Sequence, residues 1–270
     1  MEKKSRRKFL LGAAGVLGGS LLTAWIFRRN ILMNTIFKTT VNPAILASPA
    51  PSLDTDVCVL TSRQPEGPLY IPSPERSNII EDRVGKELDL RIQVLRYPDC
   101  TPIENAVVEI WQGDAEGKYS GYPVEVTIDA WETLMQVITN GEKRGDEFNI
   151  KPTEEGTFLR GLQRTDKNGW VSFNTIFPAW YTFRIPHIHF KVFVGKKELL
   201  TSQFYFDKEI EDRVFTTLDP YKKMGVCPNT VQSDFAVAQK PGNVDGLMLK
   251  PIWSDDSPLT ATAKIGVKQA

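Results

Sequence analysis

Apolar and polar residues alternate in several short runs between residues 88 and 206. In Leu88–Val94 every second residue is apolar, which is typical of a strand with one buried face. Turn-forming residues lie at Asp99–Pro102 and Lys167–Gly169. Together with 18 prolines and 19 glycines, this pattern predicts an all-β protein with a β-sandwich fold. The other predicted strands are Ala106–Trp111, Trp170–Ile176, His187–Phe193 and Leu199–Phe206.

One helix is predicted inside the long connection from Pro123 to Thr157. Asp129 is its expected N-cap because Glu132 follows three residues later, and Asn140-Gly141 is its expected end. We expect the apolar face to pack on the sandwich, and a contact in a homo-oligomer or a lid over a pocket are the alternatives. That face consists of Trp131, Leu134, Met135 and Ile138.

Charge and length narrow the class of protein. The chain carries 33 basic and 33 acidic residues, and 41% of its residues are hydrophobic. This balance is typical of a soluble globular enzyme and offers no positive excess for nucleic-acid binding. Residues 55–270 have the length of one globular domain.

The first 30 residues differ from the rest of the chain. The sequence SRRKFL at residues 5–10 and the apolar, glycine-rich stretch that follows resemble a twin-arginine export signal. The run from Phe9 to Phe27 is also long enough for a membrane anchor. Both interpretations place the domain at 55–270 outside the cytoplasm, in the periplasm or the extracellular space. Residues 31–54 are a predicted linker, because they contain prolines and no amphipathic pattern.

The three cysteines, Cys58, Cys100 and Cys227, are an odd number. An exported protein can form a disulfide from any two of them, and Cys58–Cys100 is the pairing we expect. Their spacing contains no CxxC element, so they do not predict a zinc or iron–sulfur site.

Both histidines of the chain fall in one predicted strand, within RIPHIHFKV at residues 184–192. Successive side chains of a strand point to opposite faces, so His187 and His189 share a face and converge on one point. Two imidazoles in an otherwise apolar strand are costly to bury unless something binds them, and histidine is the commonest metal ligand. The pair therefore predicts a metal site.

Tyr181, six residues before His187, indicates which metal this is. A phenol with a pKa of about 10 binds as phenolate only to a strongly Lewis-acidic ion, which favours Fe(III) over Zn(II) or Mg(II). A set of two tyrosines and two histidines would be a non-haem Fe(III) site.

Longer segments around these residues resemble the intradiol ring-cleavage dioxygenases, of the protocatechuate 3,4-dioxygenase type. They follow the family's order over about residues 55–220. The segments are EGPLY at 66–70, AVVEIWQGDAEGKYSGY at 106–122, FLRG at 158–161 and TDKNGWVSFNTIFPAWY at 165–181. The resemblance implies a sandwich of two antiparallel sheets whose long loops carry the iron.

The resemblance also implies roles for single residues. Tyr181 would be the ligand that dissociates and accepts a proton from the substrate. Arg184 would stabilise the negative charge that develops on the substrate ring, with Gln203 beside it. The four ligands of non-haem Fe(III) would be Tyr119, Tyr181, His187 and His189.

The implied reaction uses O2 to cleave a catechol-type aromatic ring between its two hydroxyl-bearing carbons, which gives a cis,cis-muconate-type diacid in aromatic compound catabolism. Three positions depart from the family's pattern, since Gly113 replaces a frequent cysteine and both Ala179 and Phe183 replace glycines. None of the three is a predicted ligand. Phe183 lies between Tyr181 and Arg184, so its departure bears on the choice of substrate.

Two other classes of protein would also use the histidine pair. A non-catalytic β-sandwich that binds a metal or ligand at the cell surface needs neither phenolate ligands nor a guanidinium beside them. A zinc or copper hydrolase needs a carboxylate or a third imidazole near the site, and Asp114 is the candidate for it.

Overall fold

The computed structural model describes residues 59–144, 147–239 and 244–268. The predicted signal or anchor at 1–30, the predicted linker at 31–54 and Cys58 lie outside these ranges. Within the described ranges, none of the helices has the length and apolar character that a membrane span requires.

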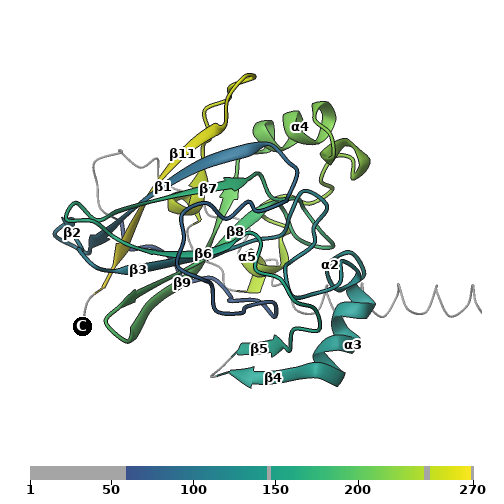
Figure 1. Cartoon of the computed structure of the whole chain (residues 1–270), viewed down its shortest axis with the longest axis horizontal. Coiled ribbons are helices and arrows are strands. Elements are labelled where there is room, and N and C mark those ends of the chain that lie inside the picture. The colour runs from purple at the N-terminus through teal and green to yellow at the C-terminus, as the bar shows by residue number, and fades with distance from the viewer. Residues whose placement is uncertain (1–58, 145–146, 240–243, 269–270) are drawn as a thin grey trace, which may run out of the picture. The chain divides into compact units, whose positions relative to one another are not determined.

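Two sheets form the sandwich (Figure 1). The first is built around β1 (Glu87–Arg96), whose residues are buried in alternation as the sequence predicts. β1 pairs in parallel with β11 (Leu259–Val267) on one side. On its other side it pairs antiparallel with β7 (Trp170–Ile176) and with the short β2 (Thr101–Pro102).

The second sheet positions the histidines. Its order is β10 (Met248–Leu249), β9 (Lys197–Phe206), β8 (His187–Val194), β3 (Val107–Trp111) and β6 (Arg160–Arg164). All neighbours are antiparallel except β10 and β9. Most pairs in the two sheets are antiparallel, which confirms the predicted sandwich, and the pairs β1–β11 and β9–β10 are parallel. A chain segment that returns to β1 or β9 through a long connection, not a hairpin, can pair in either direction.

The two faces of β8 have different environments. Ile188, Phe190 and Val192 are completely buried in the hydrophobic core between the sheets, and the ring of Phe190 stacks on that of Phe204 at 4.3 Å. Because the side chains alternate, His187 and His189 point to the opposite face. Loops and the segment after β3 cover that face, so the histidines are buried as well.

The long connection forms a separate layer of structure. It contains α2 (Glu125–Ile128), α3 (Ala130–Asn140) and a hairpin of β4 (Gly141–Arg144) and β5 (Glu147–Ile150). Figure 1 shows these elements together at the edge of the sandwich. The predicted helix is confirmed, since the carboxylate of Asp129 accepts hydrogen bonds from the first backbone N–H groups of α3. The predicted apolar face is only partly packed, because Trp131, Leu134 and Met135 are half-buried and Ile138 is 66% exposed. The contact of α3 with the cluster around Tyr119 comes from Val137.

The remaining helices follow β9. They are α4 (Lys208–Thr217), η2 (Tyr221–Lys223), α5 (Phe235–Gln239) and η3 (Asp245–Leu247). Tyr221 packs into the core and donates a hydrogen bond to the carbonyl of Phe177 at 2.7 Å. After η2 the chain returns to the segment before β8. There the backbone N–H of Phe235 donates a hydrogen bond to the carbonyl of Phe183.

The expected Cys58–Cys100 disulfide involves a residue outside the described ranges, and within those ranges Cys100 is a free thiol. Cys100 lies in the turn after β1, and its Sγ faces the carbonyl oxygen of Pro98 at 3.7 Å. Cys227 is also a free thiol and is buried.

Candidate metal centre

Four side-chain atoms that can bind a metal meet on the covered face of β8. Nε2 of His187 lies 3.1 Å from Nε2 of His189, 3.2 Å from Oη of Tyr119 and 3.1 Å from Oη of Tyr181. β8 supplies both histidines, the loop after β3 supplies Tyr119, and the turn before β8 supplies Tyr181. The structure therefore brings together all four of the residues that the sequence identifies as candidate ligands.

The spacing and protonation of these atoms fit a single cation. Two ligand atoms that are each about 2.1 Å from one ion, at angles of about 90–110°, are about 3.0–3.4 Å apart. Nδ1 of His187 donates to the carbonyl of Ile185 at 2.6 Å, so its Nε2 directs a lone pair into the cluster. Burial lowers the pKa of both His187 and His189 well below the ordinary value, so both imidazoles are neutral and able to ligate.

The two phenols set a condition on the cation. Burial raises the pKa of Tyr119 and of Tyr181, and the positive charge of Arg184 opposes this rise at both phenols. Both side chains therefore keep their protons at neutral pH until a strongly Lewis-acidic ion replaces them. As phenolates they would bring two negative charges, which suits a trivalent ion better than a divalent one.

Aromatic packing fixes the ring of His189. The indole of Trp111 stacks on this imidazole at a centroid distance of 4.9 Å and an interplanar angle of 10°. On the other side, a Cβ at Gly67 would lie 3.2 Å from Cε1 of His189, and Gly67 has a φ of +79°. Only glycine fits such a close approach in a left-handed conformation.

A row of polar residues crosses the second sheet through this ring. Arg160, Trp111, His189 and Gln203 are register partners on β6, β3, β8 and β9. Among the described residues, Nη1 of Arg160, Nε1 of Trp111 and Nδ1 of His189 are buried without a hydrogen-bond partner. A ligating histidine usually donates from its second nitrogen, so ordered water is the expected partner of these groups.

Arg184 and Gln203 lie beside the four atoms, as the resemblance implies. Nη1 of Arg184 donates to Oη of Tyr181 at 3.3 Å, and its Nη2 donates to Oε1 of Gln203. Nε2 of Gln203 in turn donates to the carbonyl of Pro65 at 2.7 Å. The guanidinium is thus held next to the more exposed of the two tyrosines.

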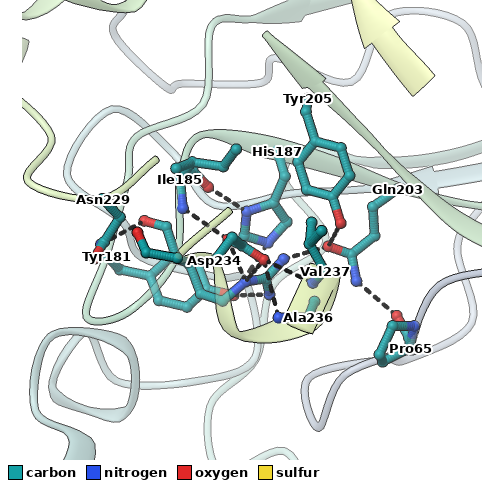
Figure 2. A network of polar contacts seen from close by, with 12 residues as sticks. Pro65, Tyr181, Ile185, His187, Gln203, Tyr205, Asn229, Asp234, Ala236 and Val237 are labelled. Atoms are coloured by element: carbon teal, nitrogen blue, oxygen red, sulfur yellow. Dashed lines mark hydrogen bonds and ion pairs between the residues drawn. The ribbon is translucent and has the colours of Figure 1, made fainter. Parts of the chain in front are cut away.

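Asp234 completes this network and was not identified from the sequence (Figure 2). Its buried carboxylate pairs with Nε of Arg184 at 3.0 Å and accepts from the backbone N–H of Ile185 at 2.9 Å. It also accepts from the first N–H groups of α5, those of Ala236 and Val237. Burial alone would lower the pKa of Arg184, but the carboxylate of Asp234 raises it above its ordinary value. The one local signal is an aspartate directly before a short helix, which is an N-cap pattern.

The turn between Tyr181 and Arg184 contains Phe183 in a left-handed conformation, with φ of +65°. The backbone N–H of Arg184 bonds to the carbonyl of Tyr181 across this turn at 2.9 Å. Glycine adopts this conformation without strain, which explains why it is usual at this position in the family that the sequence resembles. A residue with a side chain destabilises such a turn by about 1–2 kcal/mol.

Asp114, the candidate third ligand of a hydrolase, has other partners. It accepts hydrogen bonds from the backbone N–H groups of Glu116 and Lys118 at 2.9 Å and pairs with Arg83 at 3.5 Å. In the part of the chain that the structure describes, no three or more His, Cys, Asp and Glu side chains are grouped so that they could hold a metal. The carboxylate of that alternative is therefore not beside the histidine pair.

Comparison with known proteins identifies the family. The model of the dioxygenase family matches residues 66–233, which is more than half of the chain. Chlorocatechol 1,2-dioxygenase of Cupriavidus pinatubonensis is 26% identical over 157 residues, and the match covers 53% of each chain, so this chain spans about half the length of that relative.

Solved structures show the same fold. An intradiol ring-cleavage dioxygenase from Tetranychus urticae has a TM-score of 0.64 and 27% identity, with 78% of this chain and 95% of that chain covered. A 3-chlorocatechol 1,2-dioxygenase from Rhodococcus opacus is similar in fold, with a TM-score of 0.50, 20% identity, and 78% and 73% of the two chains covered. The chain therefore belongs to the dioxygenase family and has the β-sandwich fold of the intradiol ring-cleavage dioxygenases.

Proposed function

We propose that the protein is an intradiol dioxygenase that uses non-haem Fe(III) and O2 to cleave a catechol-type ring to a cis,cis-muconate-type dicarboxylate. The observation that carries the proposal is the convergence of two phenol oxygens and two imidazole nitrogens at about one ion's ligand spacing. When bound, Fe(III) would supply the Lewis acidity that deprotonates the phenols and activates the substrate's two oxygens. The residues that would hold it are Tyr119, Tyr181, His187 and His189.

The two tyrosines have different surroundings and therefore different roles. Tyr119 is 1% exposed and is enclosed by the cluster of Trp111 and Tyr122, so it would remain in place. Tyr181 is partly exposed, lies on a strained turn and accepts a hydrogen bond from Arg184. Its phenolate oxygen is the one placed to take a proton from an arriving catechol hydroxyl.

Arg184 would stabilise the negative charge on the substrate. Asp234 and Gln203 hold its guanidinium in one orientation, and Asp234 keeps it protonated at every pH of interest. A fixed cation next to Tyr181 favours the transition state, in which charge develops on the ring, over the neutral substrate. The relatives named for chlorocatechol and for intradiol ring cleavage support catechol or a substituted catechol as the substrate.

Spectroscopy and turnover test the proposal. Full-length protein loaded with Fe(III) should be red-brown from charge transfer between tyrosinate and iron. Anaerobic addition of catechol, 3-chlorocatechol or protocatechuate should shift the band, and O2 should then bleach the shifted band and yield the ring-opened diacid. Tyr119→Phe is the matched variant, since it removes one oxygen donor with little change in shape, and it should lose most of the colour.

Two results would contradict the proposal. A colourless protein that retains zinc instead of iron would favour the hydrolase. A coloured protein whose spectrum does not respond to any catechol would favour the non-catalytic binding module.

We also propose that residues 1–30 export the catalytic domain at 55–270 through a twin-arginine-type pathway, with residues 9–27 as a cleaved signal or a retained anchor. The support is the sequence SRRKFL before an apolar stretch. Fractionation of producing cells should recover the protein in the periplasm or membrane. Changing Arg6 and Arg7 together to lysine should leave it in the cytoplasm, and an unchanged distribution would contradict export by this route.

A further inference from the structure

Lys191 follows the two histidines on the same face of β8. Its side chain is only 7% exposed, and a buried ammonium is stable only with charged or polar partners. It forms one ion pair with Glu66 and a second with Glu198 at 2.9 Å, and its Nζ lies 4.4 Å from the centre of the Tyr70 ring. Glu66 is equally enclosed, with 9% of its side chain exposed.

Glu66 belongs to the loop Pro65–Tyr70, which crosses the face of β8 that carries the histidines. Several further hydrogen bonds hold this loop, including one from Arg160 to the carbonyl of Leu69 at 2.9 Å. The carboxylate of Glu66 accepts from Asn149 at 3.1 Å, and the carbonyl of Pro68 accepts from the backbone N–H of Ile150 at 2.7 Å. The carbonyl of Pro65 accepts from Gln203, as described above. Glu66 is thus the charged link between the second sheet and the end of β5.

The loop in turn contacts His189. A Cβ at Gly67 would be in tight contact with this imidazole, at 3.2 Å from its Cε1. Tyr70 packs edge-on against Trp111 at 5.0 Å, and Trp111 stacks on the ring of His189. A shift of the loop would therefore change the contact that Gly67 makes with the edge of the His189 ring. It would also move the Trp111 indole that stacks on the face of this ring.

We propose that Lys191 and Glu66 are a positioning pair that fixes the height of the loop Pro65–Tyr70 above His189, and so limits the room for the substrate ring. This inference rests on the proposed function. The pair is remote from the proton transfer at Tyr181, so its loss should weaken substrate binding more than it slows the chemical step. Misplacement by about 1 Å can cost about a hundredfold in rate, and we expect a smaller effect because the backbone bonds to Ile150 and Gln203 remain.

The test compares Lys191→Met, Glu66→Gln and the rescue variant Lys191→Arg in the full-length, iron-loaded protein. Both disrupting variants should raise KM for catechol about tenfold, with kcat within about threefold, and Lys191→Arg should restore KM. The control is Arg63→Met, which breaks the half-exposed end of the same network, at Glu198, and leaves the contacts of Glu66 in place. A variant that merely folds poorly would lose iron colour and kcat together.

Hydrogen exchange on the metal-free protein tests the positioning directly, whatever the activity. Lys191→Met should speed exchange in the loop Pro65–Tyr70 and leave β1 unchanged. Unchanged exchange in this loop, or a KM within about twofold of the wild type for both variants, would overturn the inference. If the wild type neither colours nor cleaves catechols but the loop exchanges faster in the variant, the proposed function fails and the positioning of the loop stands.

Discussion

Replacing Asp234 with alanine should destabilise the protein by about 3–5 kcal/mol, because the change leaves the buried guanidinium of Arg184 without its counter-ion. It also removes the acceptor for the backbone N–H of Ile185 and the N-cap of α5. Denaturant unfolding measures this loss. With Arg184 no longer fixed next to Tyr181, kcat/KM for catechol should fall about 10–100-fold under conditions where the variant is still folded.

One further variant separates charge from shape at this position, and a second serves as a surface control. Asp234→Asn keeps the size and one acceptor oxygen, so it should retain more stability than the alanine variant while losing similar activity. Asp212→Ala breaks an exposed ion pair with Lys208 on α4 and should change the unfolding free energy by less than about 1 kcal/mol. If Asp234→Ala is no more destabilising than Asp212→Ala, the role assigned to this carboxylate is wrong.

The parts of the fold that could be predicted from sequence are those set by patterns among residues close together in the chain. Strands such as β1 and β7 have one face in the core, so their apolar residues recur at every second position. The same alternation places His187 and His189 on one face, and the N-cap at Asp129 marks the start of α3. These features depend on neighbours within a few residues, which the sequence shows directly.

The rest of the site depends on contacts between distant segments. Asp234 lies 50 residues after Arg184, and only the path of the chain from η2 to α5 brings its carboxylate to the guanidinium. The parallel pairing of β11 with β1 likewise joins the end of the chain to its middle. Lys191 shares a face with the histidines by alternation alone, but its partner Glu66 lies on a loop more than a hundred residues earlier. No local pattern encodes such pairs.

The buried carboxyl group of Glu211 on α4 should make the stability of the protein fall as the pH rises. Burial raises the pKa of Glu211 from 4.5 to about 8, and Asp212, Asp234 and Asp207 nearby add to this effect against the opposing charge of Lys208. Between these two pKa values the folded protein holds a proton that the unfolded chain releases. The free energy of unfolding therefore contains a contribution that is complete below about pH 4.5 and is lost as the pH rises through about 8.

Glu211→Gln isolates this contribution, because an amide of the same shape does not titrate. At about 1.4 kcal/mol per unit of pKa shift, the loss amounts to at most about 5 kcal/mol over the whole window. The unfolding free energy of the variant relative to the wild type should thus rise between about pH 5 and pH 9 in denaturant titrations.

Glu209→Gln, an exposed position on the same helix, should give no such trend. Parallel curves for the wild type and Glu211→Gln would show that Glu211 is ionised in the folded protein. The negative charge of Asp234 is one of the causes that raise the pKa of Glu211. Ionisation of Glu211 at high pH would therefore place a like charge near the carboxylate that pairs with Arg184.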